Sequence, residues 1–118
     1  MLAEFSLFPL GGAPHISDEL AEALTIVDRS GLPYQLTPTG TCLEGEWGEV
    51  MRVIRLCEQR MRQISPHVVT LIKIEDDQDA GPKLIRNVTS VEEKLGRPLS
   101  HAVSASAMPE TEPSRDIE

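Results

Sequence analysis

The sequence predicts a single α+β domain in the order strand, helix, strand, strand, helix, strand, with one extra helix near the C-terminal end. Three observations lead to this prediction. The chain has 118 residues, which is room for one domain. Two segments carry apolar residues at the three-to-four spacing of helices, and four shorter segments have the alternating or fully apolar pattern of strands. Clusters of glycine and proline separate these segments.

The first strand and the first helix are predicted at the N-terminal end. Residues 2–8 alternate between apolar and more polar side chains, as a half-buried strand does. A break rich in proline and glycine follows at 9–14, and Ser17 can cap the helix after it. The inner stripe of this helix consists of Leu20, Leu24 and Val27. Gly31 is a natural stop for the helix.

A hairpin and the longest helix are predicted next. The short strands Tyr34–Thr37 and Thr41–Glu44 flank the turn residues Pro38-Thr39-Gly40. The segment from Trp47 to Ile64 has apolar residues at steps of three and four, which predicts a helix. These residues are Trp47, Val50, Ile54, Cys57, Met61 and Ile64. Pro66 ends the helix.

The C-terminal third is predicted to hold a strand, a short helix and a tail. The segment Val68–Ile74 is apolar on both sides, which is typical of a strand buried inside a structure. An acidic loop follows at 75–81. The capping box Ser90-Val91-Glu92-Glu93 predicts the start of a short helix that ends near Gly96. Residues 104–118 hold four acids and one base, and we expect a mobile acidic tail after a domain spanning residues 1–103.

The predicted order is that of a split βαβ, or ferredoxin-like, antiparallel sheet. Both long helices follow right-handed crossovers and therefore cover the same face of the sheet. The other face includes large apolar side chains such as Phe8 or Ile72, which a monomer would leave in water. We therefore expect the sheets of two subunits to meet, giving a homodimer or a homotetramer.

Charge and composition exclude several classes of partner. The chain has 11 Lys and Arg against 19 Asp and Glu, and its net charge of -8 would repel a phosphate backbone. It has one Trp, one Tyr and two Phe, too few to stack several bases, so nucleic acid is disfavoured. A secretion signal and a segment long enough to span a bilayer are both absent from the sequence, so we expect a cytoplasmic protein without membrane contact.

The sequence predicts no metal, cofactor or catalytic set. The loop at 8–14 lacks a GxGxxG motif, a P-loop ending and an arginine that could hold an anion. His15, His67 and His101 do not have ligand spacing, and the acidic loop lacks the alternating Asp residues of a calcium site. Cys42 and Cys57 form no CxxC pair and are expected to be buried reduced thiols. No nucleophile and base can be proposed together, so the protein is not expected to be an enzyme.

The most informative stretch runs from Thr39 to Trp47. It places hydroxyls and carboxylates at a strand end, immediately before the long helix. Strand alternation puts Cys42 and Glu44 on one face and Thr41 and Leu43 on the other. The pattern is compatible with a ligand site. It is also compatible with a hairpin edge whose acids only complement a helix dipole.

Five ordered blocks of the sequence carry a family resemblance. They are Ser6–Gly11, Gly31–Pro38, Gly40–Trp47, Ile72–Ile74 and Ser90–Leu95. Together they resemble the MTH1187/YkoF-like thiamine-binding family, UPF0045, over about residues 2–96, and the Gly-Thr-x-x-Glu-Gly-Glu block is the most specific of them. The resemblance implies a ferredoxin-like subunit, a dimer of dimers, and non-catalytic binding of thiamine or its hydroxymethylpyrimidine portion.

A ligand set follows from that resemblance. An aminopyrimidine has an exocyclic amine beside ring nitrogens, so a carboxylate and several hydroxyls can satisfy it. Glu44 is the predicted amine acceptor, and Glu46 supplies a negative field for the thiazolium charge. The predicted hydroxyl partners and ring-packing residues are Ser6, Thr39, Thr41, Leu7 and Phe8. The rival interpretation is an oligomeric protein-interaction scaffold that binds no small molecule.

Overall fold

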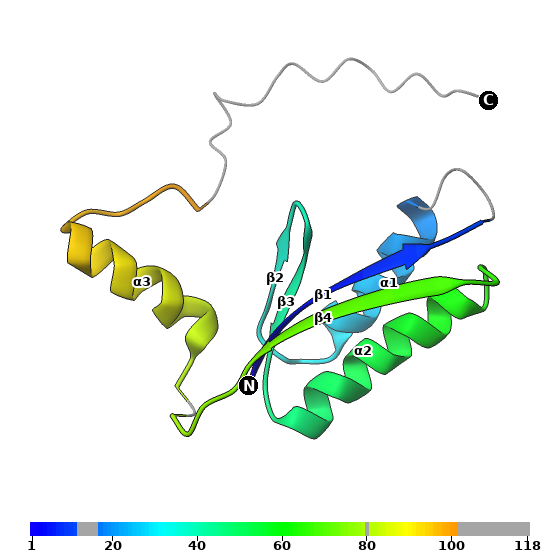
Figure 1. Cartoon of the computed structure of the whole chain (residues 1–118), viewed down its shortest axis with the longest axis horizontal. Helices are drawn as coiled ribbons and strands as arrows, with labels where there is room; N and C mark the ends of the chain where they lie inside the picture. Colours follow the sequence, from blue (N-terminus) through cyan, green and yellow to red (C-terminus); the bar gives the residue numbers. More distant parts are fainter. Residues whose placement is uncertain (12–16, 80, 102–118) are drawn as a thin grey trace, which may run out of the picture.

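A computed structural model describes residues 1–11, 17–79 and 81–101, and the predicted order of elements is confirmed (Figure 1). The elements are β1 (Leu2–Pro9), α1 (Ser17–Arg29), β2 (Tyr34–Thr37), β3 (Gly40–Glu44), α2 (Trp47–Arg62), β4 (Val68–Glu75) and α3 (Lys83–Leu95). The strands form one antiparallel sheet in the order β2-β3-β1-β4, which is the ferredoxin-like arrangement. Residues 12–14 of the break at 9–14, and the whole predicted tail at 104–118, lie outside the described residues.

The core lies between one face of the sheet and the helices α1 and α2, which cover that face together (Figure 1). Ala3, Phe5 and Leu7 of β1 point into it, and they share one side of the strand because successive side chains alternate between its faces. The buried side chains from the other elements are Ala23, Val27, Leu43, Val50, Val53, Ile54, Cys57 and Met61. Two members of the predicted α2 stripe differ: Trp47 and Ile64 lie at or beyond the ends of the helix and are exposed.

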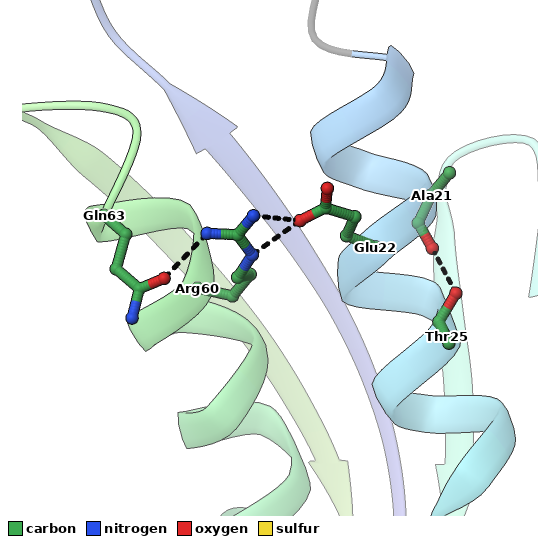
Figure 2. A network of polar contacts seen from close by, with 5 residues as sticks. All are labelled: Ala21, Glu22, Thr25, Arg60 and Gln63. Atoms are coloured by element: carbon green, nitrogen blue, oxygen red, sulfur yellow. Dashed lines mark hydrogen bonds and ion pairs between the residues drawn. The ribbon is translucent and has the colours of Figure 1, made fainter.

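The two long helices are also joined across their exposed sides. The guanidinium of Arg60 on α2 donates to the carboxylate of Glu22 on α1 (Figure 2). It also donates to the side-chain oxygen of Gln63, the C-cap residue of α2. A surface ion pair of this kind contributes less than about 1 kcal/mol. The packing of α1 on α2 therefore depends on the buried side chains beneath it.

The predicted start of the third helix is wrong. Ser90 was expected at its N-cap, but α3 begins at Lys83 and Ser90 lies inside it. The carboxylate of Glu44, at the end of β3, accepts hydrogen bonds from the backbone N–H of Lys83 at 2.6 Å and of Leu84 at 3.3 Å. A distant strand thus supplies the cap that the local sequence was expected to supply. The predicted end is confirmed, because Gly96 adopts the left-handed conformation with φ 71°.

The open face of the sheet is mixed in character. Register places Glu4, Cys42 and Lys73 side by side in its middle, with Phe8 and Leu71 towards one end. Ile72 lies on the helix side instead, opposite Phe5. The strand β4, predicted to lie inside the structure, is an edge strand. Among the described residues, no helix is both long and apolar enough to cross a membrane.

Candidate functional site

A cavity of about 250 Å³ lies where the C-terminal end of β1 meets the β2–β3 turn and α1. Five of the seven sequence-predicted site residues line it. They are Ser6, Leu7, Phe8, Thr39 and Thr41. The residues come from two strands and a turn that are far apart in sequence, so the sheet register brings them together.

The walls that sequence analysis missed come mainly from α1 and from β2. Leu20, Ala23 and Leu24 of α1 line the cavity together with Leu36 and Pro38 of the hairpin. Helical spacing did identify Leu20 and Leu24 as inward-facing residues. Helical spacing does not distinguish an inward-facing residue that packs in the core from one that lines a cavity. Leu20 and Leu24 are only half-buried, because both line the cavity.

Hydrogen bonds fix the turn beside the cavity. The Ser6 hydroxyl donates to the Thr39 carbonyl at 2.9 Å, which ties β1 to the hairpin. The Thr37 hydroxyl donates to the Gly40 carbonyl at 2.9 Å and accepts from the Gly40 N–H at 3.1 Å. These bonds satisfy backbone groups that would otherwise be free in a four-residue turn. The Ser6 hydroxyl is therefore held at the cavity wall.

Gly40 is the point of closest approach between the hairpin and β1. A Cβ at this position would lie 3.0 Å from the carbonyl oxygen of Phe5 and 3.0 Å from the hydroxyl oxygen of Ser6. A side chain here would therefore require Phe5 or Ser6 to move by a few tenths of an ångström. The glycine therefore sets the distance between the two strands that carry Ser6 and Thr41.

Gly40→Ala is expected to lower the free energy of unfolding by about 1–3 kcal/mol, because the added methyl overpacks the contact between hairpin and β1. Chemical denaturation of both proteins measures this change. Gly48→Ala on α2 is the matched control, since a Cβ there would meet nothing within 4 Å. Equal destabilisation by the two substitutions would contradict the role given to Gly40.

Thr41 is the most enclosed polar residue of the cavity, with 4% of its surface exposed. It lies opposite Phe5 of β1 and Leu36 of β2. Its hydroxyl makes no hydrogen bond within the described part of the chain, whereas the hydroxyls of Ser6 and Thr37 each make one or more. The hydroxyl oxygen of Thr41 is not one of the fully buried side-chain atoms without a partner in the described part of the chain, so it retains accessible surface, and Thr41 lines the cavity. Thr41 is therefore suited to bond to a molecule in the cavity.

Glu44 and Glu46 lie at the other end of β3 and do not line the cavity. Glu44 directs both carboxylate oxygens to the start of α3. Glu46 is exposed at the N-cap of α2, where its side chain makes no capping hydrogen bond. The structure thus divides the predicted ligand set into a cavity group and a strand-end group.

The described lining of the cavity contains no charged residue. Acidic and basic groups gather instead on the open face, where Glu4, Lys73 and Glu75 line a hollow of about 130 Å³ with Cys42. Within the ranges that the structure describes, no three His, Cys, Asp or Glu side chains gather as the ligands of a metal ion would. Such a lining is chemically compatible with a neutral, largely apolar group that has a few polar atoms.

The two thiols differ in environment. Cys57 is buried, as expected, and its Sγ lies 3.3 Å from the carbonyl oxygen of Ala23, while Cys42 is only partly buried. Burial raises the pKa of the Cys57 thiol to about 11. Partial burial, and then the charge of Glu4 with its carboxylate oxygen 3.8 Å from the sulfur, raise the pKa of Cys42 above its usual value.

Both thiols are expected to be less reactive than a free cysteine towards iodoacetamide at pH 8, because the thiolate is the nucleophile and a raised pKa lowers the thiolate fraction at that pH. Cys57 should remain unmodified and Cys42 should react more slowly than a free cysteine, with the rate rising as pH increases. Peptide mass spectrometry over time measures both rates. Protein unfolded in guanidinium is the control, and a Cys42 rate in folded protein equal to that control would contradict the expectation.

Comparison with known proteins identifies the class of protein to which this chain belongs. Residues 3–92 match the family described as thiamine-binding protein. A UPF0045 protein of Mycobacterium tuberculosis is 32% identical over 99 residues, which cover 83% of this chain and 97% of that protein. The UPF0045 protein YqgV of Bacillus subtilis is 30% identical over 100 residues, covering 80% of this chain and 96% of that protein. The chain belongs to the thiamine-binding protein family, UPF0045, as the resemblance in its sequence indicated.

Solved structures share the fold. A hypothetical protein of Methanocaldococcus jannaschii superposes with a TM-score of 0.71 at 24% identity, over 78% of this chain and 95% of that one. A protein of Thermotoga maritima described as a "putative thiamine biosynthesis/salvage protein" gives a TM-score of 0.67 at 18% identity, over 76% of this chain and 96% of that one. These likenesses support the ferredoxin-like architecture of the chain.

Proposed function

We propose that this protein binds thiamine or its hydroxymethylpyrimidine portion without catalysis, as a cytoplasmic homo-oligomer that senses, stores or delivers the ligand. The proposal is supported by membership of a family described as thiamine-binding. The observation that carries it is that five residues of the predicted ligand set line one and the same cavity. The Thermotoga maritima protein described for thiamine biosynthesis or salvage has the same fold, which is consistent with the proposal.

The size and lining of the cavity favour the pyrimidine portion over the whole vitamin. Its volume of about 250 Å³ is below the range of roughly 300–1,000 Å³ that is usual for ligand pockets. Leu7, Leu24 and Leu36 supply apolar walls for a flat ring, and the Thr41 hydroxyl can donate to a ring nitrogen or accept from the exocyclic amine. The charged thiazolium portion of thiamine would then lie outside the neutral cavity.

Isothermal calorimetry with thiamine and with hydroxymethylpyrimidine tests the proposal. Thr41→Val keeps the shape of the side chain and removes its hydroxyl, so we expect affinity to fall by about 1 kcal/mol, or about fivefold. Thr25→Val is the matched control, because Thr25 lies exposed on α1 and bonds to the Ala21 carbonyl at 2.8 Å (Figure 2). Binding of neither compound, or chemical change of the bound compound in mass spectrometry, would reject the proposal. The first of these outcomes would favour the interaction scaffold.

The ligand role of Glu44 stays a prediction. Its carboxylate is bound to α3, so contact with a ligand in the cavity requires Glu44 of a second copy or a ligand that reaches the other end of β3. If Glu44 accepts from the ligand amine, Glu44→Gln should cost about 1.5–3 kcal/mol of binding free energy. Unchanged affinity of this variant in calorimetry would assign the carboxylate to α3 alone. The same titration of a Glu46→Gln variant tests the predicted field at the thiazolium.

A further inference from the structure

A cleft lies between α1 and α2, on the side of these helices that faces away from the sheet. Its volume is about 390 Å³, which falls in the range of roughly 300–1,000 Å³ that is usual for ligand pockets. Its described walls come from the two helices and from the loop after α1. It shares no described lining residue with the cavity at the β2–β3 turn. The two hollows are therefore separate sites.

Apolar side chains form part of the cleft wall. Val53 of α2 is 7% exposed and belongs to the core, whereas Leu56, one turn further along, is 40% exposed. Ile26 of α1 and Leu32 of the following loop are partly buried and also line the cleft. An aromatic ring or a short hydrocarbon chain in the cleft would cover this surface, and removing apolar surface from water is favourable.

Two arginines line the same cleft. Arg29 and Arg52 are exposed, and neither guanidinium makes a hydrogen bond or an ion pair within the described part of the chain. The last turn of a helix favours a basic residue, which accounts for Arg29 at the end of α1. This reason does not apply to Arg52, which lies inside α2 and away from its last turn.

The charge at the cleft is positive although the whole chain has a net charge of -8. Glu49 is the one acid among the described lining residues, against two arginines. It lies in the first turn of α2, where a carboxylate stabilises the helix dipole. Further along the same pair of helices, Arg60 faces an acid and binds it, namely Glu22 (Figure 2). The arginines of the cleft line an open volume instead.

We propose that this cleft binds a small molecule that carries a carboxylate or phosphate group on an apolar body. Guanidinium groups bind both anions through paired, charge-assisted hydrogen bonds, so Arg29 and Arg52 hold the anionic end. The apolar body lies on Ile26, Leu32 and Leu56. The described walls of the cleft include no strand residue, so the site depends neither on the proposed thiamine ligand nor on the meeting of sheets from two subunits.

An NMR titration of the backbone amides tests this site. The probes are phenylacetate and phenyl phosphate, which share an aromatic ring and differ in the anion, and neutral phenylacetamide is their control. We expect both anions to shift the amides of residues 26–32 and 49–56, and the tighter binder assigns the class of anion. Phenylacetamide should bind about fivefold more weakly, because it forms no ion pair. No saturable shift with either anion, or equal binding of phenylacetamide, would overturn the proposal.

Charge variants locate the anion in the same titration. Arg52→Gln should weaken binding of the preferred anion about fivefold, whereas Glu49→Gln should strengthen it, because that change removes a like charge from the cleft. Arg55→Gln is the matched control, since Arg55 is exposed on the same helix, does not line the cleft and loses the same charge. Equal affinities of Arg52→Gln and Arg55→Gln would overturn the proposal, and so would weaker binding by Glu49→Gln.

Polyglutamate distinguishes a small ligand from an acidic protein segment. It carries carboxylates without an aromatic ring, so at equal carboxylate concentration it should shift the cleft amides less than phenylacetate does. Stronger binding of polyglutamate than of either small anion would overturn the proposal and would make the cleft a docking site for an acidic protein.

Discussion

Glu44→Ala is expected to unfold α3 while the sheet, α1 and α2 remain folded. The carboxylate of Glu44 satisfies the first two backbone N–H groups of α3, and loss of a helix cap costs about 0.5–2 kcal/mol. α3 has 13 residues and none of them is buried, so its packing contributes little. Isolated helices of about this length are marginal in water. Without the cap, most of α3 should therefore be unfolded.

The remaining contacts of α3 are too weak to replace this cap. Asn87 donates to Glu75 at 2.9 Å, and Lys83 pairs with Asp77 at 2.7 Å near the surface. The Lys83 ammonium lowers the pKa of Asp77, and the Asp77 carboxylate raises the pKa of Lys83. Both groups are thus charged at neutral pH, but the Asp77 side chain is 48% exposed, so solvent and salt screen the pair. The backbone bonds to Glu44 remain the main attachment of α3 to the sheet.

Amide hydrogen exchange across Lys83–Leu95 measures the effect, and circular dichroism reports the lost helix. Glu46→Ala is the matched control, because Glu46 is a neighbouring acid whose side chain makes no capping hydrogen bond. We expect its α3 amides to exchange as in the unaltered protein. Unchanged protection of α3 in Glu44→Ala would mean that another contact holds the helix.

Features of the fold that depend on local sequence could be predicted, and features that depend on tertiary contacts could not. The order of elements followed from periodicity, and so did the division of β1 and β3 into two faces, since alternation at Thr41, Cys42 and Leu43 is a property of the strand itself. Which face is buried depends on where the helices pack. The start of α3 did not follow, because its cap comes from a residue 39 positions earlier in the chain. A local capping box was available as an explanation and proved wrong.

The candidate site shows the same division. Hydroxyl residues near a turn were recognisable in the sequence, and the structure gathers Ser6, Thr39 and Thr41 around one cavity. The grouping of Glu44 with them assumed that residues close in sequence share a site. Thr41 and Glu44 lie near opposite ends of β3 and on opposite faces of it. Their side chains therefore contact different parts of the protein. The edge position of β4 was likewise set by sheet order, which a strand's own composition does not encode.

Leu43→Ala is expected to produce the largest loss of stability, about 2–5 kcal/mol, because Leu43 is fully buried and its truncation leaves a cavity in the core. Leu43 lies opposite Ala3 of β1 and Tyr34 of β2, in the middle of the sheet. It also stands between the strand positions that carry Thr41 and Glu44. Chemical denaturation measures the loss.

Leu36→Ala is the control for that experiment, because it makes the same truncation on the neighbouring strand at a side chain that is 59% exposed. Its cost in stability should be below about 1 kcal/mol, since little buried surface is lost. Leu36 lines the cavity, so the same variant should nonetheless weaken binding of hydroxymethylpyrimidine in calorimetry. The two variants therefore distinguish the contribution of the hairpin to stability from its contribution to ligand binding. A stability loss in Leu36→Ala equal to that of Leu43→Ala would mean that the cavity wall is part of the core.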